Sequence, residues 1–488
     1  MRCTLPSYQD MLEAVRARNL AGRRIEGVTD RSFDVAPGWV FVARHGQHAD
    51  GSQYAQEAVE RGALAVVAQQ PLNLPVPLVL VKNAAEALGH LSAAFHGDPS
   101  SHLRIVGITG TNGKTTTAAL LSHALREPDR QVGTLGTLGV QLDGELIRSL
   151  GLTTPAAPEL QAALHDLRAR GARDVVMEVS SHALRQSRTA GCVFDAAVFT
   201  NWTRDHTDYH GDMQHYLEAK GLLFAGLSQQ DRPAFAVLNL DSPAYDYLVT
   251  VTRVPVRTFG RDGDVRLLRW HDDGLAGGHG EVAVDGDTYA LQLRLPGSYN
   301  VENALAALAA ATGLDLSPAD VLARIAEVRT VSGRMHIVEM KNPDRHIVID
   351  YAHNPAGLVQ LLRFARRTSS GRVIAVFGGR GERDRGKRPL MGAIAAALAD
   401  HLVVTIDNPR GEDALQTAIE VASGARESGI PTDIVLDRYE AIRRAFALAG
   451  AGDTITISGK GSELWDEPHR GRPMTDIQAV QELADLAE

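Results

Sequence analysis

Residues 109–117 read Thr-Gly-Thr-Asn-Gly-Lys-Thr-Thr-Thr and stand between an apolar run and a helix-forming stretch. Glycines let backbone N–H groups approach phosphate oxygens without an intervening Cβ, and the following helix adds a partial positive charge at its N-terminus. Lys114 can then reach the terminal phosphates of ATP, and the Thr115 hydroxyl can ligate Mg²⁺. Ile108 replaces the first glycine of the strict G-x-x-x-x-G-K-[ST] pattern, so the motif is a G-x-x-G-K-T variant. The alternative is a glycine-rich turn without a ligand, but Lys114 and the threonines favour a phosphate loop.

The alternation of strands and helices around this loop predicts a doubly wound parallel sheet. Residues 103–108 form the expected strand before the loop, and residues 114–125 form the helix after it. Further expected strands, separated by helices, are residues 174–179, 196–200 and 234–239. Residues 265–295 alternate in polarity and contain glycines, which predicts hairpins inserted before a helix at residues 301–311. The pattern is typical of a P-loop-type α/β domain.

Two boundaries divide the chain of 488 residues, a length that suggests about three domains. The turn formers His-Gly-Asp-Pro-Ser-Ser at residues 96–101 mark the first boundary, and residues 330–335 mark the second. We predict a small α/β domain at residues 1–101, the central domain at 102–332 and a Rossmann-like α/β domain at 333–488. The strands expected in the two outer domains are residues 39–43, 63–68, 77–81, 347–349, 373–377, 402–405 and 454–457, and the helices expected in the first are residues 54–61 and 84–95.

The composition indicates a soluble protein. A net charge of −9 disfavours binding to nucleic acid or to an anionic membrane, so an anionic substrate must meet local arginines and lysines. Cys3 and Cys192 are the only cysteines, which suits a reducing compartment. Residues 1–15 lack the apolar core of a signal peptide, and no apolar run is long enough to span a bilayer. We expect a cytoplasmic monomer without a membrane span.

A second polar cluster follows two of the expected strands. Glu178 ends one strand, and residues 201–211 read Asn-Trp-Thr-Arg-Asp-His-Thr-Asp-Tyr-His-Gly after the next. Strand ends in such sheets open onto the ligand crevice, so Glu178 and His206 are candidate metal ligands. Magnesium prefers oxygen ligands, and an imidazole ligand is unusual. The residues alone therefore leave a solvated polar loop as an open alternative.

Taken together, these motifs resemble the Mur ligase family over about three quarters of the chain. The central-domain motifs are residues 109–117, Glu-Val-Ser-Ser-His-Ala-Leu at 178–184, residues 205–211, and Leu-Pro-Gly at 295–297 with Asn300 and Asn303. The C-terminal motifs are Asp-Tyr-Ala-His at 350–353 and Gly-Lys-Arg-Pro-Leu-Met-Gly at 386–392. The resemblance implies an ATP-dependent ligase that forms an acyl phosphate on a carboxylate, which an amine then displaces to give an amide, ADP and phosphate.

The resemblance also implies roles for individual residues. Lys220 matches a lysine that CO₂ converts to a carbamate, which helps to hold a second Mg²⁺; from the residues alone, Lys220 would be an ordinary exposed helical lysine. Glu178 and His206 match ligands of the other Mg²⁺, so the expected metal set is Thr115, Glu178, His206 and carbamylated Lys220. Lys114, Lys220, His206 and Glu178 form the expected catalytic set. The expected ATP contacts are Gly110, Thr111, Asn112, Gly113, Lys114, Thr115, Thr116, Asn303, Arg334 and Asp350.

Within the family, the details resemble the MurE branch, which adds meso-diaminopimelate to UDP-N-acetylmuramoyl-L-alanyl-D-glutamate in peptidoglycan precursor synthesis. The residues that match contacts to the muramoyl dipeptide or its uridine nucleotide are Ser32, His48, Thr153, Thr154, Ser180, Gln186 and Arg188. Those that match contacts to diaminopimelate are Arg383, Asp407, Asn408, Arg410, Gly459 and Glu463. An arginine can grip a carboxylate bidentately, whereas residues 407–410 alone would also suit an ordinary turn with a solvated arginine.

Several departures from the MurE pattern keep two alternatives open. Arg31-Ser32-Phe33 stands where Asp-Ser-Arg is usual, and Gly378-Gly379-Arg380-Gly381-Glu382-Arg383-Asp384 replaces Gly-Cys-Gly-Gly-Asp-Arg-Asp. Ser462 and His336 also depart from the pattern. A MurE-like paralogue that joins another amino acid to another acyl acceptor is one alternative. An ATP-binding switch protein without ligase activity is the other, although it has no use for Lys220, Arg188 and residues 205–210 together.

Overall fold

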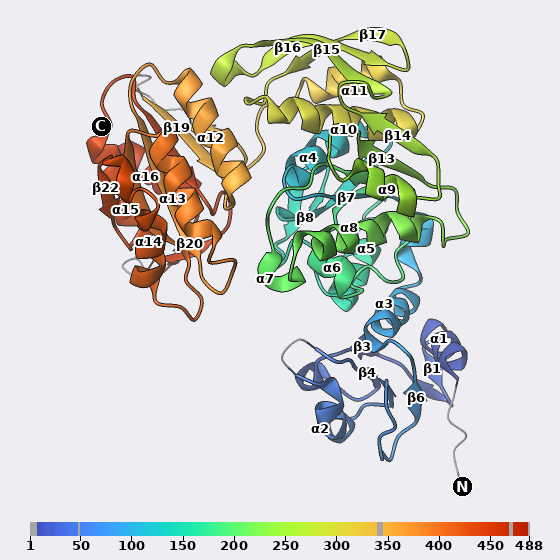
Figure 1. Cartoon of the computed structure of the whole chain (residues 1–488). Helices are drawn as coiled ribbons and strands as arrows, with labels where there is room; N and C mark the ends of the chain where they lie inside the picture. The colour runs from blue at the N-terminus through green and yellow to red at the C-terminus, as the bar shows by residue number, and fades with distance from the viewer. Residues whose placement is uncertain (1–6, 47–48, 339–344, 468–471, 487–488) are drawn as a thin grey trace.

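The computed structural model describes residues 7–46, 49–338, 345–467 and 472–486. These residues form three α/β domains, each built on its own sheet of four, eleven or six strands (Figure 1). The central domain lies between the N-terminal domain, in blue, and the C-terminal domain, in orange (Figure 1). The predicted fold class is confirmed. No helix in the described part of the chain combines the length and apolarity needed to cross a bilayer.

The N-terminal sheet has the order β3-β4-β5-β6, with every neighbouring pair parallel. Its strands are β3 (Gly27–Thr29), β4 (Trp39–Ala43), β5 (Ala65–Ala68) and β6 (Leu78–Leu80), and its helices are α1 (Tyr8–Arg16), α2 (Ala55–Glu60) and α3 (Ala84–Phe95). The predicted elements recur with small shifts, but the sequence alone missed α1. Met11 and Val15 are the buried residues of this helix, so its apolar stripe is narrow among polar neighbours.

The central sheet has the order β10-β9-β8-β11-β7-β12-β13-β14-β15-β16-β17. Strand β7 (Arg104–Thr109) lies between β11 (Ala172–Glu178) and β12 (Ala196–Phe199), and both pairings are parallel. The other strands are β8 (Gln131–Gly136), β9 (Gly139–Leu142), β10 (Glu145–Arg148), β13 (Phe235–Asn239), β14 (Val256–Phe259), β15 (Val265–Asp272), β16 (Gly278–Val284) and β17 (Asp287–Leu293). The predicted hairpins at 265–295 are present: β15, β16 and β17 pair antiparallel with one another, and β15 joins them to the main sheet by a parallel pairing with β14.

Helices cover both faces of this sheet, which explains why its inner strands are mostly apolar. Helix α4 (Lys114–Ala124) follows the phosphate loop and packs against α10 (Tyr299–Gly313). The other helices are α5 (Ala157–Ala169), α6 (Ser181–Arg185), α7 (Thr207–His210), α8 (Met213–Leu227), α9 (Tyr245–Val251) and α11 (Pro318–Ile325). Helix α5 also packs against α3 and so joins the N-terminal domain to the central one.

The C-terminal sheet has the order β18-β19-β23-β20-β21-β22, parallel except for β18. Its strands are β18 (His336–Val338), β19 (His346–Asp350), β20 (Val373–Arg380), β21 (His401–Asn408), β22 (Thr432–Ile434) and β23 (Thr454–Ser458), with a hairpin of β24 (Trp465–Glu467) and β25 (Arg472–Met474). Its helices are α12 (Pro355–Thr368), α13 (Lys387–Leu398), α14 (Ala414–Ser423), α15 (Arg438–Leu448) and α16 (Asp476–Leu486). The carboxyl ends of β19, β20, β21 and β23 lead into loops that face the phosphate loop, where a ligand crevice is expected.

Candidate active site

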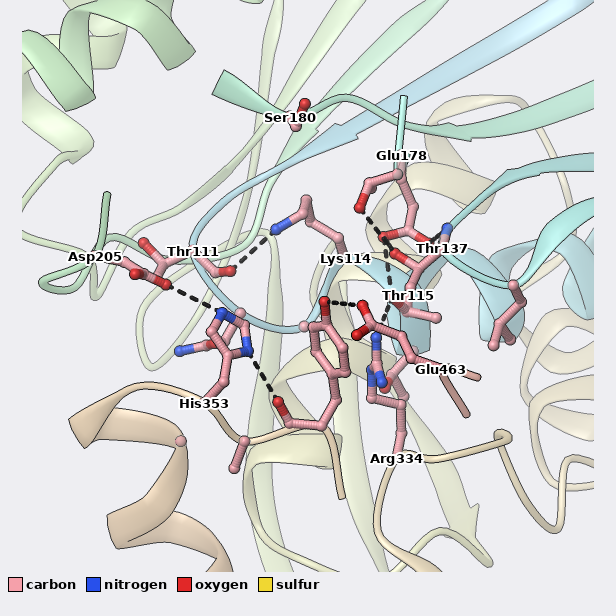
Figure 2. Close-up of a pocket in the computed structure, with 18 of the residues that line it drawn as sticks. Thr111, Lys114, Thr115, Thr137, Glu178, Ser180, Asp205, Arg334, His353 and Glu463 are labelled. Atoms are coloured by element: carbon pink, nitrogen blue, oxygen red, sulfur yellow. Dashed lines mark hydrogen bonds and ion pairs between the residues drawn. The ribbon is translucent and has the colours of Figure 1, made fainter. Parts of the chain in front are cut away.

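The phosphate loop is held in shape by its neighbours. Gly110 has φ +148° and Gly113 has φ +85°, and a Cβ at either position would collide with the side chain of Thr200 or Asn303. The Thr200 hydroxyl donates to the carbonyl of Asn112 at 2.6 Å. Lys114 Nζ donates to the carbonyl of Gly110 at 2.9 Å and to that of Thr111 (Figure 2). Contacts within the protein therefore hold the loop in shape, and its lysine rests on the loop backbone.

Glu178 brings a buried carboxylate to the start of α4. It ends β11, and its Oε2 accepts a hydrogen bond of 2.9 Å from the Thr115 hydroxyl (Figure 2). The backbone N–H and the hydroxyl of Thr137 donate to the same carboxylate. A hydroxyl and a carboxylate side by side fit Mg²⁺, which prefers oxygen ligands and keeps several waters. The described residues contain no group of three or more His, Cys, Asp or Glu placed to hold a metal.

His206 lies in the same cleft, without a recorded contact to Glu178 within the described residues. Its backbone is left-handed at φ +54°, and its ring lies 4.8 Å from the ring of His182 and 5.8 Å from that of Tyr216. Burial lowers the pKa of His206 well below its ordinary value, although Asp205 opposes this shift. The ring is therefore neutral, as a metal-binding imidazole must be.

Lys220 is buried and is not the exposed helical lysine that the residues alone would suggest. Its side chain is almost completely inaccessible, and Nζ donates to the carbonyl of Gly110 at 2.7 Å while lying 4.4 Å from the centre of the Tyr216 ring. Burial lowers the pKa of Lys220 well below its ordinary value, and the nearby charge of Lys114 lowers it further. Helix α8 carries this side chain beneath the phosphate loop, a placement that helical periodicity could not reveal.

The residues expected to contact the nucleotide surround the loop. Asn303 Oδ1 accepts from the Thr117 hydroxyl at 3.3 Å, beneath Gly113. Arg334 donates to the Thr115 hydroxyl at 3.2 Å, and its guanidinium lies 4.1 Å from the centre of the Tyr351 ring. Asp350 lines the same cleft and accepts from two backbone N–H groups. Thr111, Asn112 and Thr116 also line it.

Most residues expected to hold the acyl substrate lie together on the central domain. The Thr154 hydroxyl donates to the carbonyl of Glu178 at 2.9 Å, and the Thr153 and Thr137 hydroxyls lie 3.2 Å apart. Arg188 donates to the carbonyl of Thr154 at 2.7 Å and to the side chain of Gln186. Thr153, Thr154, Ser180, Gln186 and Arg188 all line the cleft.

The two N-terminal residues of that set stand apart from it. The Ser32 hydroxyl donates to Glu57 at 2.9 Å within the first domain, and Ser32 does not line the cleft. His48 lies outside the described residues.

The residues expected to hold the amino acid come from the C-terminal domain. Arg383 forms an ion pair of 3.3 Å with Asp208 of the central domain. Glu463 accepts from the Tyr351 hydroxyl at 2.6 Å. Arg383, Asn408, Arg410 and Glu463 line the cleft. Asp407 and Gly459 do not, because both lie behind Arg380, which donates to the Asp407 carboxylate at 2.9 Å and to the Gly459 carbonyl at 3.1 Å.

Sequence reasoning missed the residues that join the two halves of the site. Asp205 of the central domain faces three groups of the C-terminal domain, and Figure 2 shows its contact with His353. Asn354 and Lys387 are the other two. Asp205, His353 and Lys387 stand inside the quoted motifs, but adjacency in sequence does not reveal a contact between domains.

One cleft of about 1470 Å³ therefore collects the phosphate loop, the acyl-substrate residues and the C-terminal arginines. Family models match the chain in three segments that follow the three sheets: the Mur ligase family catalytic domain at residues 24–96, the Mur ligase middle domain at 108–311 and the Mur ligase glutamate ligase domain at 333–461.

Known proteins are similar over nearly the whole chain. A UDP-N-acetylmuramoyl-L-alanyl-D-glutamate–2,6-diaminopimelate ligase of Geobacillus thermodenitrificans is 39% identical over 438 residues, which cover 89% of each chain. A solved structure of a ligase with that name superposes with a TM-score of 0.68 at 31% identity and covers 99% of both chains. MurF ligase of Thermotoga maritima in complex with ADP shares the fold, with a TM-score of 0.63 at 20% identity over 94% of this chain and 97% of the other. With the loop, the buried lysine and three matching domains in the same order, the chain belongs to the Mur ligase family and is an ATP-dependent ligase.

Proposed function

We propose that this ligase joins meso-diaminopimelate to UDP-N-acetylmuramoyl-L-alanyl-D-glutamate, with ATP converted to ADP and phosphate. The observation that carries the proposal is the shared cleft. It is lined by Lys114 of the expected ATP contacts, by Arg188 of the expected dipeptide contacts and by Arg410 of the expected diaminopimelate contacts. Relatives that carry this ligase name, at 36–40% identity over about nine-tenths of the chain, support the same substrate pair.

In the proposed reaction, a carboxylate oxygen of the acyl substrate bonds to the γ-phosphorus of ATP as the bond from phosphorus to the ADP oxygen breaks. The amine nitrogen then attacks the acyl carbon, loses a proton, and phosphate departs. Lys114 and Arg334 lie beside the loop and would neutralise the anions that must meet. Mg²⁺ held by Thr115 and Glu178 would add further charge neutralisation.

The same proposal assigns a carbamate to Lys220. A neutral amine is the form that attacks CO₂, and the strongly lowered pKa of Lys220 supplies it. The nitrogen would bond to the carbon of CO₂ and release a proton, which turns a buried amine into an anion suited to a second Mg²⁺.

Contacts between the central and C-terminal domains support protection of the acyl phosphate. Arg204 and Thr207 of the central domain both donate to Asp384 of the C-terminal domain, at 3.1 Å and 3.2 Å. With the contacts of Asp205, these bonds bring the C-terminal domain over the phosphate loop, where it would exclude water from the intermediate.

The decisive experiment supplies the purified protein with ATP, Mg²⁺ and UDP-N-acetylmuramoyl-L-alanyl-D-glutamate and measures phosphate release with meso-diaminopimelate, with L-lysine and without an amine. We expect release that requires both the nucleotide dipeptide and diaminopimelate, with the tripeptide detected by its mass. Protein that binds ATP but releases no phosphate under any of these conditions would overturn the proposal.

A second candidate is a MurE-like ligase with another acyl acceptor. It rests on the first domain, where Phe33 is 64% exposed beside Ser32, in place of the arginine usual in the MurE pattern. Turnover with diaminopimelate and a different carboxylate, but not with the UDP-muramoyl dipeptide, would favour this candidate. The proposal also includes action as a cytoplasmic monomer; sedimentation as a stable dimer at working concentration would contradict that part.

A further inference from the structure

Arg380 occupies the end of the cleft that the C-terminal domain contributes. It is the last residue of β20, its side chain is 17% exposed, and it lines the cleft. Its Nε donates to Asp407 at 2.9 Å, and its Nη2 donates to Glu463 at 3.1 Å and to the carbonyl of Gly459. Four acceptors, counting the Tyr351 hydroxyl at 3.4 Å, hold the guanidinium in one position.

Glu463 and Asp407 are both engaged by this guanidinium. Glu463 accepts from Tyr351 with one oxygen and from Arg380 with the other, although its side chain is 35% exposed. Asp407 has a completely buried carboxylate, so an entering ligand would not reach it without displacing Arg380. A ligand ammonium group that approached Glu463 would therefore meet an existing cation. The carboxylate is already neutralised by the protein itself.

Two further arginines, Arg383 and Arg410, line the cleft. Arg383 is paired with Asp208 at 3.3 Å. Arg410 is exposed, lines the cleft and has no ion pair recorded among the residues that the structure describes. Glu382 is exposed and lines the cleft, and it accepts a hydrogen bond from the backbone N–H of Gly411. The pocket thus offers an arginine to an anion and offers no carboxylate at Glu463 to a second cation.

We propose that Arg380 determines the amine specificity of the site. Its guanidinium takes the place of a substrate ammonium beside Glu463. The ligase therefore accepts α-amino acids whose side chain ends in a carboxylate, with or without a second amino group. The inference rests on the proposed function, because the amine must enter this end of the cleft. It widens the substrate class from diaminopimelate alone to amino dicarboxylic acids of the same chain length.

The test compares meso-diaminopimelate with 2-aminopimelate, which has the same carbon chain and terminal carboxylate but lacks the second amino group; L-lysine is the third amine. We expect kcat/KM for the two dicarboxylic acids to agree within about threefold and L-lysine to be at least about 100-fold poorer, since a site built to bind a polar group rejects a ligand without it. A preference for diaminopimelate over 2-aminopimelate of about 30-fold or more would overturn the inference, since a carboxylate such as Glu382 would then be recognising the second ammonium.

Two variants test whether Arg380 is the residue that makes the enzyme treat diaminopimelate and 2-aminopimelate alike. Arg380→Gly exposes Glu463, and we expect it to shift the ratio of kcat/KM toward diaminopimelate by at least about tenfold; Arg380→Lys retains the cation and should leave the ratio near that of the unaltered enzyme. An unchanged ratio in a folded Arg380→Gly protein would overturn the role of Arg380. If that variant fails to fold, the comparison of amines on the unaltered enzyme still decides the inference. The absence of turnover with every amine would instead refute the proposed function.

Discussion

The side-chain amide of Asn354, on the C-terminal domain, donates a hydrogen bond of 3.0 Å to the carboxylate of Asp205 on the central domain. Lys387 Nζ and His353 Nε2 face the same carboxylate at 3.5 Å and 3.4 Å. Burial alone would raise the pKa of Asp205, but the hydrogen bond from His353 and the charge of Lys387 lower it well below its ordinary value. An ionised, almost inaccessible carboxylate therefore joins the two domains at the edge of the phosphate loop.

We expect Asp205→Asn to weaken closure of the C-terminal domain. Hydrogen bonds to a charged group contribute about 1.5–3 kcal/mol each, so the loss of this charge should lower kcat by about 100-fold. ATP binding should change much less, because the loop backbone is intact. Small-angle X-ray scattering with ATP analogue bound should show a larger radius of gyration. Asp129→Asn, at an exposed position of the same domain, is the control; equal activity of the two variants would remove Asp205 from closure.

We expect Lys220→Ala to abolish turnover while ATP binding is largely retained. The proposed carbamate binds the second Mg²⁺, whereas the phosphate loop binds ATP. Nuclear magnetic resonance of protein incubated with carbon-13 bicarbonate should show a carbamate signal that the variant lacks. Lys82→Ala removes an exposed lysine and should keep both signal and activity. Full turnover by Lys220→Ala would rule out the carbamate.

We expect Arg410→Lys to raise the KM for diaminopimelate by about tenfold and to leave the KM for ATP unchanged, since a point charge replaces a planar fork that holds a carboxylate bidentately. Initial rates of phosphate release at varied amino acid and varied ATP give both constants. Arg426→Lys, at an exposed position of the same domain, is the matched control. An unaltered KM for the amino acid would place Arg410 outside the pocket.

We expect Asp476→Ala to destabilise the C-terminal domain by about 3–5 kcal/mol, because it leaves Arg438 charged and buried. The two side chains lie 2.6 Å apart with exposures of 2% and 0%, and Trp465 also donates to Asp476. Differential scanning calorimetry should show a lower unfolding temperature for this domain. Glu440→Ala breaks the exposed pair with Arg443 and should cost about 0–1 kcal/mol; comparable losses in both variants would contradict the expectation.

The lowered pKa of Glu412 predicts that this residue makes a pH-dependent contribution to the stability of the fold. Hydrogen bonds from Arg388 and Arg385, both of 2.9 Å, lower the pKa of Glu412 to about 2 from 4.5. Because the folded-state pKa is depressed, the stabilisation is complete above about pH 4.5 and is lost as the pH falls toward about 2. The difference in unfolding temperature between the protein and Glu412→Gln should therefore be constant from about pH 8 to about pH 5 and shrink below about pH 4.5. A difference that grows on acidification would contradict this sign.

The phosphate loop and its sheet could be predicted from sequence because their signals are local. The backbone of residues 109–117 requires glycine at two positions, because Gly110 and Gly113 adopt positive φ and face side chains that leave no room for a Cβ. Strands such as β11, buried on both faces, appear in sequence as apolar runs. Helix α1 was missed because only Met11 and Val15 of its nine residues are buried.

The chemistry of individual side chains depended on contacts that sequence spacing does not encode. Lys220 resembles an exposed helical lysine until α8 packs beneath the loop and removes it from water. Asp407 stands in the motif expected to bind the amino acid, yet Arg380 covers it. The sequence by itself therefore determined the three-domain α/β fold and the phosphate loop, because these depend on local backbone requirements and apolar patterning. Only the tertiary structure decided which charged groups are buried, paired or left free for a substrate. Burial and ion pairing depend on residues that are distant in sequence, such as Asp205 and Lys387.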